Sequence, residues 1–201
     1  MSQSSAIIIE LQYFPCISAF KLMAESKQLM IEASEQYCKM SFRNRCIITG
    51  SNGIIHLSVP LKNGRQQRTF IRDVQIDNSV KWQNQHWRSI ESCYARAPFY
   101  EYYEMKFQGL FQKEYAFLFD FNQTILDTLL SIYKSTTHIT LTEKYAKEYE
   151  GIGDFRNTFL PKNYTEYPNT ISAYTQVFED KTGPLPNLSI VDYLCCAGVK
   201  L

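Results

Sequence analysis

The most constraining feature of the sequence is its opening, in which an apolar run is followed by a turn and an amphipathic segment. Ala6–Ile9 is apolar on both of its faces, which is typical of an interior strand that helices cover on both sides. After Pro15, apolar residues recur at helical spacing from Ile17 to Met23, and the segment 28–33 predicts a second strand. This order predicts a β-α-β unit at the start of the chain.

A second local signal predicts a β-hairpin. The apolar runs 46–49 and 54–59 flank Gly50-Ser51-Asn52-Gly53, a turn sequence typical of hairpins. Because later segments are mainly helical in pattern, we predict an α/β fold that forms a single domain over 1–201, with a Rossmann-like β-α-β opening, a β-hairpin insertion and a helix-rich C-terminal half. After the hairpin we expect an extended stretch over 69–76 and then three helices. The first helix is capped by Asn78 or Ser79, the second covers about 98–115, and the third is capped by Asp120 or Asn122.

The last part of the chain predicts a strand over 138–145 and a helix over about 174–181. A final helix is expected over about 189–196, with Ser189 and Asp192 as a capping box and Gly198 as its terminator.

Composition limits the classes of partner. Lys and Arg number 21 against 20 Asp and Glu, so the basic excess typical of nucleic-acid binding is absent. No apolar run approaches the roughly 20 residues that span a bilayer, and the start of the chain lacks the basic region of a signal peptide. Six scattered cysteines without a CxxC pair and three histidines give no metal-ligand spacing. We expect a cytoplasmic protein with no membrane insertion, no nucleic-acid partner and no metal, and we leave its oligomeric state open.

A cationic cluster precedes the predicted hairpin and consists of Lys39, Arg43, Asn44 and Arg45. On an extended segment Arg43 and Arg45 would project to the same face, where their forked donors could hold one phosphate or carboxylate. The alternative is a scaffold in which the arginines pair with Glu32 or Glu35.

Two side chains are candidates for a general base. Glu10 lies at the end of the first apolar run, where an unpaired carboxylate would be costly, so it either points out at the sheet edge or is paired within a site. His86 borders the apolar face of a predicted helix and is either a base that titrates near neutral pH or a hydrogen-bonded core residue. The turn at 12–16 has no glycine, so it does not fit a dinucleotide-binding loop and no cofactor is expected.

Several stretches together resemble the WbqC-like protein family, and in particular its Bacteroidetes-type branch. The resemblance covers nearly the whole chain, and it rests on the combination of stretches rather than on any one of them. Glu10-Leu11 departs from the Gln-Pro or His-Pro pair that many members carry in the opening turn. The matching stretches are "IIIELQYFPCISAF", "SFRNRCIITGSNGIIHLSVPL", "DVQID", "HWRSIESCYARAPFYEYY", "FLFDFN" and "YTQVFEDKTGPLPNLSIVDYLCCAG". The family motif positions carried over are Tyr13, Pro15, Arg43, Asn44, Arg45, His86, Trp87, Asp120 and Asn122.

This resemblance implies a role in the biosynthesis of bacterial surface polysaccharides such as O-antigen. The expected activity is transfer of an acyl or aminoacyl group, such as glycyl, to a nucleotide-linked amino sugar. The alternative is a non-enzymatic protein that binds a glycan precursor or another biosynthetic protein.

The transferase hypothesis gives roles to seven residues. His86 or Glu10 would deprotonate the sugar amine, and the arginines would hold a phosphate or carboxylate. Tyr13 would stack on a sugar or base, and Asn44 would orient a carbonyl or hydroxyl group. The expected substrate-binding residues are Tyr13, Lys39, Arg43, Asn44 and Arg45.

Overall fold

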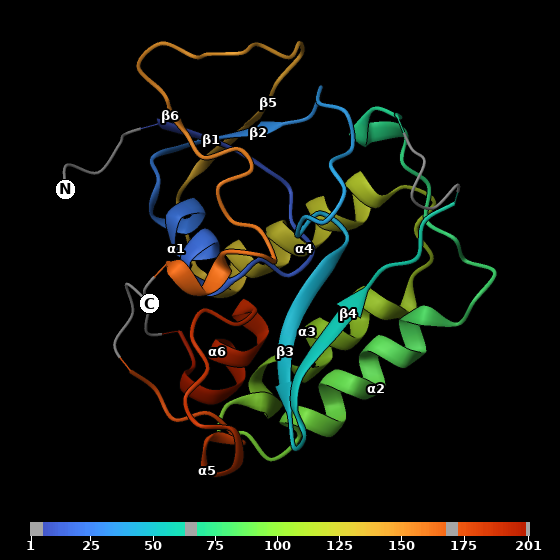
Figure 1. Ribbon diagram of the computed structural model, residues 1–201, viewed down its shortest axis with the longest axis vertical. Coiled ribbons are helices and arrows are strands. Elements are labelled where there is room, and N and C mark those ends of the chain that lie inside the picture. The colour runs from blue at the N-terminus through green and yellow to red at the C-terminus, as the bar shows by residue number, and fades with distance from the viewer. Residues whose placement is uncertain (1–5, 63–67, 168–172, 200–201) are drawn as a thin grey trace.

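A computed structural model describes residues 6–62, 68–167 and 173–199 (Figure 1). Its first layer is a parallel sheet with the strand order β5-β2-β1-β6. Helix α1 connects β1 to β2, which confirms the predicted β-α-β opening. Helices α1 and α4 lie below this sheet in Figure 1, and the loop between β5 and β6 arches above it. The elements of this layer are β1 (Ala6–Glu10), α1 (Ile17–Glu25), β2 (Gln28–Glu32), α4 (Leu118–Tyr133), β5 (His138–Leu141) and β6 (Gly153–Asp154).

Strand β1 is central because its isoleucines can be buried on both faces. Ile7, Ile8 and Ile9 are each at most 1% exposed, and each contributes about 1.5–3 kcal/mol by leaving water. The strand pairs with β2 over its whole length, and the register sets Glu10 opposite Glu32. Strand β6 was missed by the sequence analysis because it has only two residues and no periodicity.

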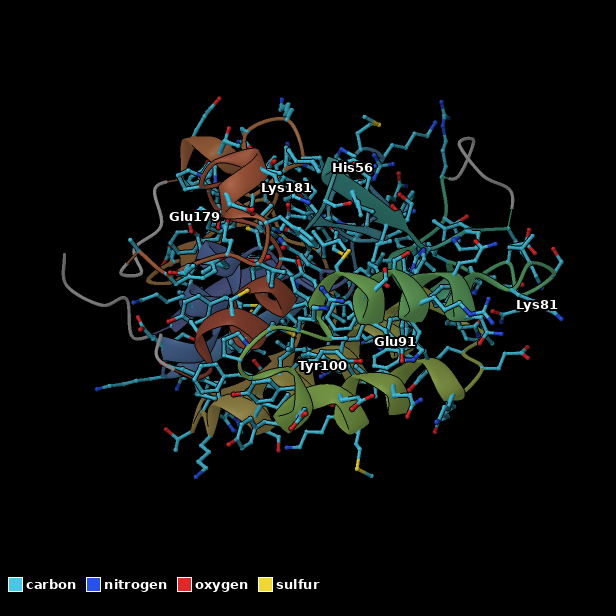
Figure 2. The ribbon with its side chains drawn as sticks, turned by 90° about the horizontal axis from the view of Figure 1, so that it is seen from below. His56, Lys81, Glu91, Tyr100, Glu179 and Lys181 are labelled. Atoms are coloured by element: carbon cyan, nitrogen blue, oxygen red, sulfur yellow. The ribbon has the colours of Figure 1, made fainter. Side chains whose placement is uncertain are left out.

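The predicted hairpin is confirmed by β3 (Arg45–Gly50) and β4 (Gly53–Ser58), which pair antiparallel. Gly53 has a φ of 105°, a backbone conformation that strongly favours glycine. Strand β3 is almost entirely buried, whereas β4 alternates and leaves His56 on its exposed face (Figure 2).

The helix-rich C-terminal half is also confirmed. Helices α2 (Trp82–Tyr94), α3 (Tyr100–Gln112) and α6 (Ile190–Ala197) pack with one another, and α2 and α6 also contact β3. Tyr100 lies between α2 and α3, where its ring stacks on that of Trp87 (Figure 2). At the start of α6, the side chain of Ser189 accepts a hydrogen bond from the backbone of Val191, which confirms Ser189 as the N-cap. The predicted capping box is not formed, because the carboxylate of Asp192 accepts from the hydroxyls of Tyr94 and Tyr174 instead.

Several local predictions were wrong. The stretch 69–76 is not a strand: it contains the 3-10 turn η2 (Ile71–Asp73), flanked by isolated bridges to other loops. The helix expected over 174–181 is reduced to α5 (Glu179–Thr182). Neither Asn78 nor Ser79 caps α2, because Asn78 instead accepts a hydrogen bond from the Trp82 indole. In these segments tertiary contacts outweigh local propensity.

Candidate functional site

Two glutamates end the neighbouring strands β1 and β2 at the carboxyl edge of the sheet. Glu10 and Glu32 are paired in register, and both are fully buried. From β1 the sheet extends through β2 to β5 on one side and to β6 on the other. Open parallel sheets bind ligands outside their carboxyl edge, where the connections diverge to either side. A ligand site is therefore expected at this edge.

The carboxyl edge holds a buried ion network centred on Arg43. The Arg43 Nε and Nη2 atoms donate to the two carboxylate oxygens of Glu35 at 2.7 and 2.6 Å, and Nη2 lies 3.7 Å from Glu10 Oε2. Such forked pairing fixes both side chains in one geometry. The salt-bridged alternative of the sequence analysis is thus the arrangement that Arg43 adopts.

Glu10 is held by two further donors. Gln12 Nε2 donates to its Oε1 at 2.9 Å, and the backbone N–H of Asn157, just past β6, donates to its Oε2 at 2.8 Å. Arg43 Nη1, Gln12 Oε1 and Asn122 Oδ1 are buried and have no partner in the part of the chain that the structure describes. Buried polar atoms without partners are rare. The residues of this edge therefore retain hydrogen-bonding capacity.

Glu32 belongs to a separate ion pair that ties the loops of this edge together. Arg156 Nη1 donates to Glu32 Oε2 at 2.9 Å, and Nη2 donates to Asp154 Oδ2 at 2.6 Å. The same guanidinium lies over the rings of Tyr145 and Tyr149, at 4.9 and 5.1 Å from their centroids. We assign the contacts of Arg156 a structural role, since they hold the segment after β6 against the sheet.

A cavity of about 410 Å³, the edge cavity, opens beside the Arg43 network. Glu35 and Asn157 belong both to this cavity and to the network. Burial raises the pKa of Glu35 above its ordinary value, although Arg43 opposes the rise. Glu35 is thus a carboxylate with increased proton affinity that borders a cavity. The lining residues are Ser34, Glu35, Gln36, Cys38, Phe70, Tyr145 and Asn157.

Three of the predicted binding residues line a second cavity of about 660 Å³, here called the cationic hollow. Lys39 and Arg45 supply its positive charges, and Arg45 Nε has no hydrogen-bond partner among the described residues. Asn44 is held rigidly because it donates to Val59 O at 3.0 Å and accepts from the Tyr37 hydroxyl at 2.9 Å. These groups suit an anionic ligand.

The structure separates Arg43 from Arg45, which the sequence analysis had placed on one face. The reason is local, because residues 41–44 form a turn rather than an extended segment, and Met40 has a φ of 53°. Arg43 therefore lies in the buried network, whereas Arg45 begins β3 and lines the cationic hollow.

The loop after β2 separates the two cavities. Gln36 and Cys38 line the edge cavity, whereas Tyr37 and Lys39 line the cationic hollow. This alternation is what extended backbone produces, since successive side chains point to opposite sides. One short segment therefore forms a wall of both cavities.

His86 and Tyr13 form a different kind of site. The Tyr13 hydroxyl and His86 Nδ1 are 2.8 Å apart, and both side chains are buried among aromatic rings that include Trp82 and Phe121. Burial lowers the pKa of His86 to about 4, so the imidazole is neutral at pH 7. Neither side chain lines the edge cavity or the cationic hollow. The sequence left two interpretations of His86 open, a general base or a hydrogen-bonded core residue. In the structure His86 is a hydrogen-bonded core residue.

Within residues 6–62, 68–167 and 173–199, no group of three or more His, Cys, Asp or Glu side chains could hold a metal ion. The six cysteines are unpaired. None of the helices described here combines the length and the apolar character needed to cross a membrane.

Comparison with known proteins supports a family assignment. The model of the WbqC-like protein family matches residues 12–152, which include Glu35, Arg43 and the cationic hollow. An uncharacterized protein of Mycobacterium tuberculosis (strain ATCC 25618 / H37Rv), Rv1507c, is 27% identical over 173 residues, covering 86% of this chain and 74% of the relative. No solved structure matches the chain significantly. The resemblance to a Bacteroidetes-type branch stays a prediction.

Proposed function

The chain belongs to the WbqC-like protein family, and we propose that it transfers an acyl or aminoacyl group, such as glycyl, to the amine of a nucleotide-linked amino sugar. The product would be a precursor of a bacterial surface polysaccharide such as O-antigen, and the reaction would take place in the cytoplasm. The observation that carries the proposal is the pair of cavities that share the wall 36–39. One contains a carboxylate of raised pKa and the other contains two cations.

In this scheme the cationic hollow holds the phosphates of the acceptor. Lys39 and Arg45 provide the charges. Asn44 orients a hydroxyl or carbonyl group of the ligand. The sugar end of the ligand would then reach past the shared wall toward the edge cavity.

Glu35 is the general base that the geometry favours, with Glu10 behind it. The amine nitrogen attacks the acyl carbonyl carbon, a C–N bond forms, and the bond from that carbon to the leaving group breaks. Glu35 takes the proton from the nitrogen and passes it to the leaving group, which departs with the electron pair. Arg43 positions Glu35, whereas Tyr13 and His86 support the site from the core.

Calorimetry of the full chain with UDP-glucosamine tests the anion site. We expect saturable binding that weakens at least tenfold in the Lys39→Ala/Arg45→Ala variant, because two charges facing the phosphates are lost. The Arg88→Ala/Lys106→Ala variant is the matched control, since it removes the same charge from exposed positions on α2 and α3. Equal weakening in both variants would contradict the assignment of the hollow.

A transfer assay tests the base. We expect Glu35→Gln to lower kcat about a hundredfold or more while KM for the sugar changes little, because a carboxamide takes no proton. Glu143→Gln, at an exposed position, is the control. A variant with unchanged kcat would exclude Glu35 as the base, and thermal unfolding of both variants shows whether the fold is retained.

One observation favours the second candidate, a non-enzymatic protein that binds a glycan precursor. His86 is hydrogen-bonded to Tyr13 in the aromatic core, so the histidine that could have served as a base lies away from both cavities. Binding of UDP-glucosamine without transfer from thioester or phosphate-activated acyl and aminoacyl donors would support this candidate.

A further inference from the structure

A third cavity, of about 400 Å³, lies between α1 and the segment that follows β6. The proposed transfer assigns it no role. Phe159 and Tyr167 form one wall, with ring centroids 4.8 Å apart, and Leu22 of α1 also lines it. The lining residues are Ser18, Lys21, Leu22, Glu25, Phe155, Phe159 and Tyr167. The cavity is called the apolar cavity below.

The charges among the lining residues of the apolar cavity are balanced. Lys21 Nζ lies 3.4 Å from Glu25 Oε1, one helical turn further along α1. The pair therefore offers neither sign of charge in excess. A neutral ligand group fits this arrangement better than an ionised one, because Lys21 and Glu25 neutralise each other and leave no net charge to balance an ion.

Ser18 is an uncharged polar residue in the wall. It is only 8% exposed, its backbone N–H donates to Asn187 Oδ1 at 2.8 Å, and its hydroxyl has no partner within the described ranges. A buried hydroxyl without a partner costs stability. Ligand sites commonly combine apolar walls with a few such polar groups, which fix the orientation of the ligand.

The apolar cavity is connected to the edge cavity through one short segment. Phe155 and Phe159 line the apolar cavity, whereas Asn157, between them, lines the edge cavity and binds Glu10 through its backbone N–H. The Phe155 N–H donates to Ile8 O at 2.8 Å, which anchors this segment to β1. A ligand in the apolar cavity would therefore contact the segment that also borders the site of transfer.

We propose that the apolar cavity is a second ligand site, which holds a short neutral acyl group whose carbonyl oxygen accepts a hydrogen bond from Ser18. Its volume suits a group of fragment size rather than a long lipid chain. Identifying this group as the acyl part of the donor rests on the proposed function, whereas binding of the group itself does not.

The experiment uses N-butylbutanamide as the probe and measures its binding to the full chain by saturation-transfer NMR titration. We expect saturable binding that weakens about threefold to tenfold in Ser18→Ala, the effect of losing one hydrogen bond. Leu22→Trp, which fills the cavity from a partly buried position, is expected to abolish binding. Ser92→Ala, an exposed serine of α2, is the matched control and should bind like the parent.

Each contrary outcome has a defined meaning. Binding that is unchanged in Leu22→Trp, or absent in the parent, would overturn the site. Equal affinities of Ser18→Ala and the parent for N-butylbutanamide would contradict the proposed hydrogen bond from Ser18. If the probe binds as expected and UDP-glucosamine does not bind, the proposed function is contradicted but the apolar cavity remains a ligand site. If UDP-glucosamine binds and the probe does not, the acyl site is contradicted and the acceptor site is retained.

Discussion

Two buried clusters of titratable groups begin at the same junction between β1 and α1, and they differ in access. Glu10 leads into the Arg43 network, where the carboxylate of Glu35 borders a cavity. Tyr13, three residues later, leads to His86 inside the aromatic core. Both clusters are buried, so burial does not distinguish them; the cavity beside Glu35 does.

The two clusters also differ in how their titratable groups respond to burial. In the Arg43 network the guanidinium pairs with the carboxylate of Glu35, and burial raises the pKa of that carboxylate. The Tyr13–His86 pair avoids charge altogether, since burial raises the pKa of the phenol and lowers that of the imidazole. Under the proposed function the first arrangement would exchange a proton with a ligand in the edge cavity, whereas the second stabilises the core in neutral form.

The largest expected effect comes from removing the cation of the first cluster. Arg43→Met leaves the carboxylates of Glu35 and Glu10 buried without a counter-charge, so we expect the free energy of unfolding to fall by about 3–5 kcal/mol. Urea denaturation at pH 7 measures this loss. Arg88→Met, at an exposed helical position, should change stability far less. Equal losses in the two variants would show that the network is not what holds this edge together.

The second expected effect is the pH dependence of the His86 cluster. Because the pKa of His86 is lowered from 6.5 to about 4, the unfolded chain binds a proton at a higher pH than the folded one. The stability that neutral His86 contributes is present above pH 6.5 and is lost as pH falls through the folded pKa of about 4. The full loss is about 3 kcal/mol.

A variant isolates this contribution from that of Asp192, whose pKa burial raises to about 6 and which acts in the opposite direction. The stability contributed by Asp192 is fully present below its unfolded pKa of 3.8 and is lost as pH rises through 6. Urea unfolding of the parent and of His86→Gln from pH 7 to pH 4 measures the difference. The parent should lose more stability than the variant on acidification, and parallel curves would mean that His86 is not buried in neutral form.

The sequence predicts the elements whose signals are local. The isoleucine run of β1 and the Gly50–Gly53 turn carry their own periodicity and turn chemistry, so the β-α-β opening and the hairpin were found. Strand β6 exists only because Ile7 and Ile8 pair with Gly153 and Asp154, and no pattern in two residues could indicate it.

The candidate site was predicted in part, for a similar reason. Residue types identified the cationic cluster, and Lys39, Asn44 and Arg45 do line one hollow. The turn at 41–44 that sends Arg43 to Glu35 depends on tertiary packing, so Glu35 was considered only as a pairing partner. One signal was available: Glu10 and Glu32 lie at the ends of the two predicted strands, and the carboxyl ends of parallel neighbours meet at one edge of the sheet.

The smallest expected effect on stability comes from a change in the Tyr13–His86 cluster. Tyr13→Phe keeps the ring but removes the hydroxyl, so His86 Nδ1 is left buried without that partner, and we expect a loss of about 1–3 kcal/mol by urea denaturation. Tyr102→Phe, at an exposed position of α3, should be nearly neutral. Binding of UDP-glucosamine should not change in Tyr13→Phe, because the hydroxyl lines neither cavity. A Tyr13→Phe variant that keeps its stability and loses ligand affinity would reverse the roles assigned to the two clusters.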